Sequence, residues 1–218
     1  MAPAGLAGLH VLADDEPRWA HGPLEQARAA CAGGARVVQL RCKHATDRQA
    51  LELAHEIRRI TRQDGVLFFV NDRFDLALAS GADGVHLGQQ DLPPERVPQA
   101  LRRRLQIGRS THDLSEARRA LREPVDYVAF GPLFGTTSKP GAGPARGLRA
   151  LEAVVAAVAP RPVIAIGGIA ADNLAQVLGV GGRGVAVLSA IADAPDPLAA
   201  TQALVEGLAG GASARDEA

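Results

Sequence analysis

Short apolar runs rich in β-branched residues alternate with longer segments rich in Ala, Leu, Arg and Glu along the whole chain. The short runs predict strands at 9–13, 37–41, 66–70, 84–87, 106–109, 127–130, 163–166 and 185–188. The longer segments predict helices near 23–32, 47–63, 73–80, 94–104, 114–122, 148–158, 172–178 and 197–209. Eight β–α units in 218 residues favour an α/β fold, a single-domain (β/α)8 TIM barrel, for which roughly 200–250 residues is usual. An open doubly wound sheet is the structural alternative.

Composition favours a small-molecule enzyme over a protein that binds nucleic acid or membranes. Positive and negative charges balance at 24 each, and aromatic residues make up 3%, so there is neither a basic field for nucleic acid nor a platform for base stacking. Residues 1–12 lack the pattern of a signal peptide, and no apolar run reaches the ~20 residues of a membrane span. We therefore expect a cytoplasmic protein with one catalytic domain over 1–209 and a flexible tail over 210–218. The oligomeric state stays open, a homo-oligomer included.

Polar side chains gather at the carboxyl ends of three neighbouring predicted strands. A two-residue period in the second strand places Gln39, Arg41 and Lys43 on one face, while Asp72 and Asp91 follow the next two strands. In a parallel barrel these ends meet at one mouth, where active sites lie. Cations and carboxylates gathered there suit a ligand with a metal-bound phosphate group. A solvated edge of the barrel is the alternative for the three residues of the second strand.

The two carboxylates at this mouth are candidate metal ligands, and an amide lies beside them. Carboxylate oxygens are preferred ligands of Mg²⁺, which often shares them with substrate phosphates, so Asp72 and Asp91 form a candidate Mg²⁺ site. Either Asp can instead cap a helix or form a turn, and Asp91 precedes a Leu-Pro-Pro run. Asn71 can hydrogen-bond to a heterocycle, or it can belong to a turn. Cys42 falls on the opposite face of its strand, and we expect it to be a small core residue.

Two later segments can bind a second anion. The long loop 131–144 carries Thr136, Ser138 and Lys139 between Gly and Pro residues, which is typical of a phosphate-binding lid, although an inert loop is the alternative. Segments 166–169 and 188–189 follow the last two predicted strands, where barrels often bind a substrate phosphate.

Two further patterns are weaker. Residues 179–184 spell G-x-G-x-x-G, but they follow a helix and open a strand, so they are not the dinucleotide-binding motif. His86 and His112 lie near strand ends, and a hydrogen-bonded structural role is favoured over contact with substrate.

Taken together, these segments resemble the thiamine phosphate synthase (thiamine-phosphate pyrophosphorylase) family from about residue 9 to residue 197. The resemblance rests on seven motifs in order, at 39–43 (QLRCK), 70–72 (VND), 84–91 (GVHLGQQD), 108–110 (GRS), 131–134 (GPLF), 136–139 (TTSK) and 165–169 (AIGGI). The sequence departs from the family pattern at Cys42, where an acidic residue is common, and at Ser138, where Thr is common. Neither departure removes a group that the family's chemistry needs.

The resemblance implies a barrel that uses Mg²⁺ to join a hydroxymethylpyrimidine diphosphate to a thiazole phosphate or its carboxylated form. By position, the pyrimidine diphosphate would be bound by Gln39, Arg41, Lys43, Asn71, Ser110 and Lys139, with Arg41, Lys43 and Lys139 as catalytic cations. Mg²⁺ would be held by Asp72 and Asp91. The thiazole phosphate would be bound by Thr136, Ser138, Gly168, Leu188 and Ser189.

Three other functions stay open at this point. A thiazole tautomerase paralogue shares the fold, but such proteins tend to lack the Asp pair and to carry a histidine where this chain has Pro132. A non-catalytic barrel that binds thiamine precursors is a second alternative, against which the retained Asp, Lys and Arg residues speak. A sugar-phosphate isomerase is a third, but it needs an acid–base pair at the mouth, which the sequence lacks.

Overall fold

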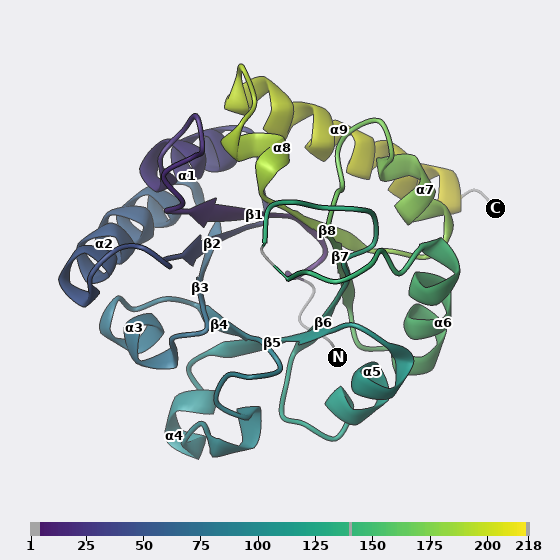
Figure 1. Ribbon diagram of the computed structural model, residues 1–218, viewed down its shortest axis with the longest axis horizontal. Coiled ribbons are helices and arrows are strands. Elements are labelled where there is room, and N and C mark those ends of the chain that lie inside the picture. Colours follow the sequence, from purple (N-terminus) through teal and green to yellow (C-terminus); the bar gives the residue numbers. More distant parts are fainter. Residues whose placement is uncertain (1–4, 140, 217–218) are drawn as a thin grey trace.

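The computed structural model describes residues 5–139 and 141–216, and within them eight parallel strands close into a barrel in sequence order (Figure 1). The strands are β1 (Gly8–Asp14), β2 (Val37–Arg41), β3 (Leu67–Asn71), β4 (Gly84–Leu87), β5 (Gln106–Thr111), β6 (Tyr127–Phe130), β7 (Val163–Ile166) and β8 (Gly184–Val187). Each strand pairs with the next, and β8 closes the ring on β1 through pairs such as Leu9↔Val185. The predicted barrel is confirmed, and an open sheet is excluded.

The helices form an outer ring around the barrel (Figure 1). They are α1 (Pro23–Ala32), α2 (Asp47–Asp64), α3 (Phe74–Ala79), the 3₁₀ turn η1 (Pro94–Arg96), α4 (Gln99–Arg102), α5 (Leu114–Ala120), α6 (Leu148–Val158), α7 (Leu174–Gly179), α8 (Ser189–Ala192) and α9 (Pro197–Asp216). All eight predicted strands are present with bounds within two residues. Among the described residues, no helix is both long and apolar enough to cross a membrane.

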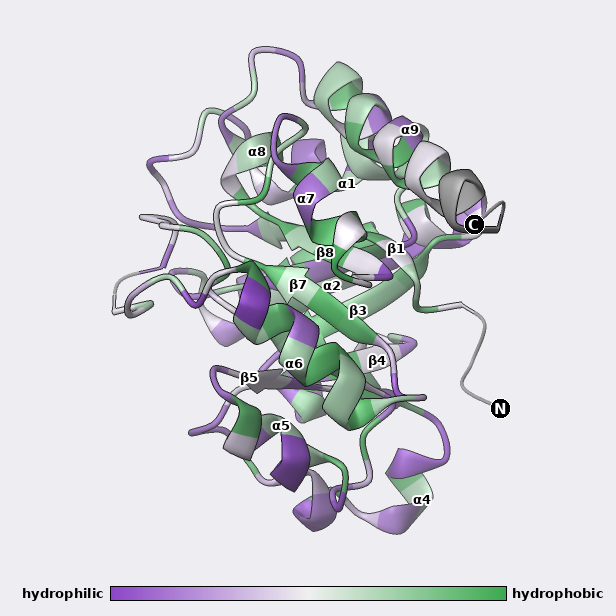
Figure 2. Ribbon diagram, turned by 90° about the vertical axis from the view of Figure 1, so that its right-hand side faces the viewer, coloured by the Kyte–Doolittle hydropathy of each residue, from purple (hydrophilic) through white to green (hydrophobic). Residues whose placement is uncertain are grey.

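The alternation of side chains along each strand produces two cores, and Figure 2 shows the strands as the hydrophobic centre of the molecule. Outward-facing residues pack under the helices in one large cluster that includes Val38 and Leu40. Inward-facing residues fill the barrel in a smaller cluster that includes Leu12, Phe69 and Tyr127. Because a strand alternates with period two, the inward positions lead directly to the mouth at the strand ends.

The structure differs from the prediction in three helices. The helix predicted at 94–104 is split into η1 and α4 around Pro98, whose backbone cannot donate the hydrogen bond of a continuous helix. The four-residue helix α8 was not predicted. Helix α9 continues to Asp216, through most of the expected tail, because its backbone lies close against Leu178 of α7 at Gly211. Residues 1–4 and 217–218 of the predicted domain and tail lie outside the described residues.

We expect Gly108→Ala to destabilise the barrel. A Cβ at this buried β5 position would lie 2.1 Å from Tyr127 Cζ, and overpacking of this kind costs about 1–3 kcal/mol of unfolding free energy. The control is Gly210→Ala on the exposed face of α9, where an added Cβ meets nothing within 4 Å and should add up to about 1 kcal/mol. Urea unfolding of both variants measures the effects. Equal stabilities would contradict the tight packing inside the barrel.

Candidate active site

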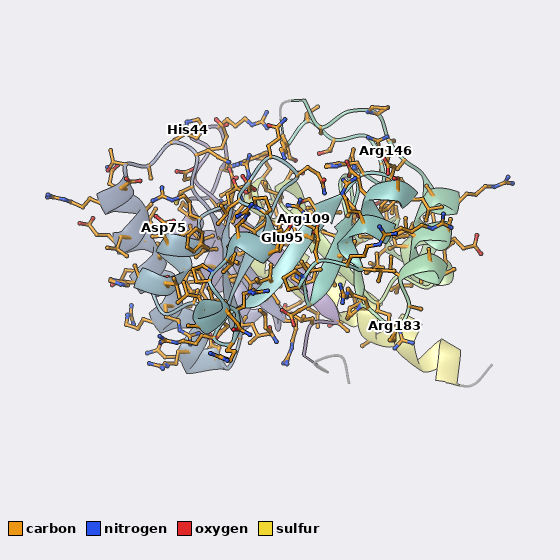
Figure 3. The ribbon with its side chains drawn as sticks, turned by 90° about the horizontal axis from the view of Figure 1, so that it is seen from below. His44, Asp75, Glu95, Arg109, Arg146 and Arg183 are labelled. Carbon is orange, nitrogen blue, oxygen red and sulfur yellow. The ribbon has the colours of Figure 1, made fainter. Side chains whose placement is uncertain are left out.

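A cavity of about 370 Å³ opens at the carboxyl ends of the strands. Figure 3 shows this end of the barrel, with His44 and Arg146 near it and Arg183 at the opposite end. Eight of the predicted substrate-binding residues line this cavity: Arg41, Ser110, Thr136, Ser138, Lys139, Gly168, Leu188 and Ser189. The structure thus brings together segments that are up to about 150 residues apart in sequence.

A second cavity, of about 90 Å³, lies among the inward-facing residues of the barrel. Its polar lining includes Gln39 and Asn71, which the sequence singled out, and His10, His86 and Tyr127. Arg41, Ser110 and Lys139 line both cavities. A flat ring with polar edges would find donors and acceptors in the smaller cavity, while its charged substituent would lie toward the three polar residues that the two cavities share.

Asp72 and Asp91 lie beside each other at the mouth, and Asp72 contacts Lys43. The Lys43 Nζ atom donates to Asp72 Oδ2 at 2.5 Å, and the two carboxyl groups share a hydrogen bond. Burial acts to raise the pKa of Asp72, but the hydrogen bonds with Asp91 and Lys43 outweigh it and lower that pKa. Burial and the adjacent Asp72 raise the pKa of Asp91. The two carboxyl groups are thus close enough to act on each other, and a single cation can offset the charge of both.

The local backbone aims both carboxylates at this point. Asp72 adopts a left-handed conformation with φ of +66°, and its N–H donates to His86 O at 2.8 Å. Asp91 Oδ2 accepts from the Gly88 N–H at 2.6 Å. Hard oxygen donors of this kind fit a divalent cation such as Mg²⁺. Among the described residues no group of three or more His, Cys, Asp or Glu side chains is placed to hold a metal ion, so further ligands would come from substrate or water.

The loops after β6 and β7 are fastened together at their base. The N–H groups of Leu133 and Phe134 donate to the carbonyls of Ile166 and Gly167 at 2.8 and 3.0 Å. Gly168 has φ of +63°, and a Cβ there would lie 2.5 Å from Gly135 O. Only glycine permits this close approach. The result is a cradle of backbone and hydroxyl groups at one side of the larger cavity, opposite the carboxylate pair.

His86 and Ser110 are joined in a buried hydrogen-bond chain. His86 Nδ1 lies 2.8 Å from the Tyr127 hydroxyl, and His86 Nε2 lies 2.8 Å from Ser110 Oγ. Burial lowers the pKa of His86 to about 4, so the ring is neutral at pH 7 and acts as a hydrogen-bonding spacer. His112 Nδ1 pairs with Glu116 at 3.0 Å, and the residue lines the larger cavity. A hydrogen-bonded role thus applies to both histidines.

Cys42 is half-buried and packs against the outer core, as predicted. Burial raises the pKa of its thiol to about 12, so it stays protonated and unreactive.

Stability is expected to fall in mild acid because of the buried His10. Burial lowers its pKa from 6.5 to about 4. Between these values the unfolded chain binds more protons than the folded chain, so the free energy of unfolding falls as pH drops through this window. A shift of this size corresponds to roughly 3 kcal/mol. Urea midpoints at pH 7.5 and 4.5 measure it; the difference should shrink in His10→Gln but persist in the exposed-site control His55→Gln.

Sequence reasoning missed several residues that the structure places here. Asp14 ends β1 and contacts Arg41; its position at a strand end was the signal that could have found it. Arg146 lines the larger cavity, and its buried Nε has no hydrogen-bond partner among the described residues. Nothing in the sequence distinguishes it from other surface arginines. His10 and Tyr127 are inward-facing by strand period, and their polar groups inside an apolar barrel are the signal that could have found them.

Comparisons with known proteins agree with this architecture. The family model described as thiamine monophosphate synthase matches residues 9–191. The thiamine-phosphate synthase of Methanoregula boonei is 46% identical over 198 residues, covering 91% of each chain. That of Thermus thermophilus is 45% identical over 206 residues, covering 94% of this chain and 98% of the relative.

Solved structures give the same result. Thiamine phosphate pyrophosphorylase from Pyrococcus furiosus superposes with a TM-score of 0.85 at 38% identity, over 95% of this chain and 98% of that one. N-(5'-phosphoribosyl)anthranilate isomerase from the same organism, at 16% identity and a TM-score of 0.65 over 94% and 99% of the two chains, shares the fold alone. The family match spans most of the barrel and includes every strand end that forms the site, and the chain therefore belongs to the thiamine monophosphate synthase family.

Proposed function

We propose that the chain synthesises thiamine phosphate. It would transfer the pyrimidinylmethyl group of 4-amino-2-methyl-5-hydroxymethylpyrimidine diphosphate to the ring nitrogen of a thiazole phosphate, or of its carboxylated form, and release diphosphate. The observation that carries this proposal is the mouth itself. Lys43 pairs with Asp72 of the Asp72–Asp91 pair there, and Arg41 and Lys139 line a cavity that can hold a second phosphorylated ring.

The two cavities suggest how the substrates divide the site. The aminopyrimidine ring would occupy the smaller cavity against Gln39, Asn71 and Ser110, with its diphosphate toward Arg41 and Lys139. The thiazole phosphate would lie in the larger cavity. There its binding groups would be Thr136, Ser138, Gly168, Leu188 and Ser189.

Asp72 and Asp91 would hold Mg²⁺, as their shared position and oxygen donors fit that ion. When bound, Mg²⁺ would offset the negative charge of the diphosphate. Lys43 already pairs with Asp72, so it would lie close to the diphosphate whose charge the Mg²⁺ offsets.

With the thiazole phosphate itself, the bond changes need no proton transfer. The carboxylated form would in addition lose its carboxylate as CO₂, and the ring carbon left behind would take up a proton from water. The bond between the methylene carbon and the diphosphate oxygen breaks, and its electron pair leaves with the diphosphate. The electron-rich aminopyrimidine stabilises the carbon cation, and the lone pair of the thiazole nitrogen then forms the new C–N bond. The chain's tasks are to stabilise the departing charge with Arg41, Lys43 and Lys139, and to hold the nucleophile in line. Burial lowers the pKa of His86 to about 4 and so makes its ring a weak proton acceptor, which fits a site that requires no general base.

One assay tests the proposal. Purified protein is mixed with both precursors and Mg²⁺, and thiamine phosphate and diphosphate are measured together. We expect equimolar products with at least one of the two thiazole forms. Absence of product with both forms would refute the function. Isomerisation of the thiazole without the pyrimidine substrate would instead indicate the tautomerase, against which the Asp72–Asp91 pair argues.

A further inference from the structure

Asp14 has a completely buried carboxylate whose two oxygens are both occupied. Its Oδ1 accepts hydrogen bonds from the Glu16 backbone N–H at 3.0 Å and from the Trp19 indole Nε1 at 2.8 Å. Its Oδ2 accepts from the Arg41 guanidinium. A buried charge is tolerated when it is paired and fully hydrogen-bonded. Asp14 meets that condition, and its ionic partner belongs to the proposed diphosphate site.

The barrel register brings this pair together. Asp14 and Arg41 are direct neighbours in the ladder between β1 and β2, so both side chains leave the wall on the inner side. Gln26 on α1 fixes the Asp14 backbone in turn, because it accepts the Asp14 N–H at 2.9 Å and donates to the Asp14 carbonyl at 3.1 Å. An arginine has five N–H donors. The hydrogen bond from Arg41 Nη1 to Asp14 therefore leaves other N–H donors of the guanidinium available for a phosphate in either cavity.

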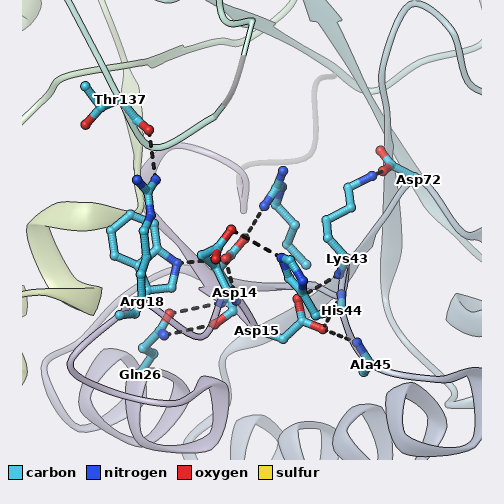
Figure 4. Close-up of polar contacts among 12 residues, drawn as sticks. Asp14, Asp15, Arg18, Gln26, Lys43, His44, Ala45, Asp72 and Thr137 are labelled. Carbon is cyan, nitrogen blue, oxygen red and sulfur yellow. Dashed lines mark hydrogen bonds and ion pairs between the residues drawn. The ribbon is translucent and has the colours of Figure 1, made fainter.

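The same network reaches the loop on the other side of the mouth. The Arg18 guanidinium stacks over the Trp19 ring, with Cζ 4.4 Å from the ring centroid. Arg18 Nη2 donates to the Thr137 carbonyl at 2.8 Å, and Figure 4 shows Arg18 reaching this residue. Thr137 lies between the two hydroxyl residues of the proposed phosphate cradle, two positions before Lys139. A continuous set of contacts thus joins this loop to Arg41.

We propose that Asp14 is a positioning residue for the reaction and that Asp14, Trp19 and Arg18 form a latch between the two substrate sites. The Asp14 carboxylate sets the direction of the Arg41 guanidinium toward the diphosphate. Trp19 and Arg18 tie that same carboxylate to the loop that carries the thiazole-phosphate cradle. The inference rests on the proposed function, since it assigns Arg41 to the diphosphate.

The first test is Asp14→Asn, which is nearly isosteric and keeps an acceptor for Glu16 N–H and Trp19. It replaces the oxygen that faces Arg41 with an amide that cannot accept. Loss of one charge-assisted hydrogen bond predicts a rise of about tenfold or more in KM for the pyrimidine diphosphate, with a smaller change in KM for the thiazole phosphate. The control is Glu56→Gln, the same chemical change in an exposed pair with Arg59 on α2, which should keep both KM values.

A double-mutant cycle separates positioning from a merely structural role. If Asp14 acts through Arg41, then Asp14→Asn should change KM by no more than roughly twofold in an Arg41→Ala background. An effect as large in that background as in the wild type would overturn the proposal. Wild-type turnover is measured first. An inactive wild type would count against the proposed function, whereas an active wild type with an unchanged Asp14→Asn variant would count against the latch alone.

Trp19 is the single tryptophan of the chain, so its fluorescence reports on the latch without turnover. Titration of the wild type with inorganic diphosphate and Mg²⁺ should change the emission, and the change should fall at least about threefold in Asp14→Asn. Equal titration curves would contradict the latch. Should Asp14→Asn fail to fold by circular dichroism, Trp19→Phe and Arg18→Gln each break one link. Both variants should raise the KM for the pyrimidine diphosphate about threefold or more. Wild-type KM values in both variants would overturn the proposal.

Discussion

Asp72→Asn is expected to abolish most Mg²⁺-dependent turnover while leaving the barrel folded. A bound metal ion supplies several kcal/mol of charge stabilisation, so loss of one of two carboxylate ligands predicts a fall of roughly 10³-fold in kcat/KM. Asn is preferable to Ala here because residue 72 has φ of +66°, a left-handed conformation that Asn tolerates better. Asp91→Ala should have a similar effect, since Asp91 is the other member of the pair. Diphosphate release at several Mg²⁺ concentrations measures both.

The matched control for this pair is Asp75→Asn. Asp75 lies three residues further along the chain and pairs with Arg73 on the surface, so the change removes a carboxylate without touching the mouth. Its turnover should equal that of the wild type. Full activity in both Asp72→Asn and Asp91→Ala would refute the assignment of the metal. Loss of activity with an altered circular dichroism spectrum would point to a structural effect of the left-handed residue instead.

Lys139→Ala is expected to lower kcat by about 10²–10³-fold, the cost typical of removing one group that stabilises developing negative charge. Lys139 lines both cavities, so it can contact a diphosphate that departs between them. It is also one of only two lysines in the chain, and the other, Lys43, lies at the same mouth. Steady-state kinetics with each substrate varied in turn would show a larger effect on kcat than on KM.

Two further variants serve as a control and as a test of the charge at position 139. Arg149→Ala removes a positive charge from an exposed position near the start of α6 without altering the cavity, and it should keep wild-type kinetics. Lys139→Arg keeps the charge but replaces a compact ammonium with a planar fork, so we expect only partial recovery. An unchanged kcat in Lys139→Ala would remove this lysine from the catalytic groups.

Much of the fold follows from local pattern. Eight β-branched runs with the correct spacing gave the barrel, and the two-residue period placed Gln39 and Arg41 inside it and Cys42 outside. Helix bounds were less accurate where local signals conflicted with tertiary contacts. Pro98 split one predicted helix, and packing against Leu178 extended α9 beyond residue 209, where the predicted helix ends.

The candidate site, like the fold, could be predicted only in part from local sequence patterns. By itself the sequence determined the strand ends, and hence that Arg41, Asp72, Asp91 and Lys139 would meet at one mouth, because strand order and side-chain period are local properties. Only the tertiary structure decided which groups touch. Asp14 pairs with Arg41 through the register of β1 and β2, and Arg18 meets Thr137 across 119 residues of sequence. Those contacts depend on closure of the barrel and on loop conformation, which no local pattern encodes.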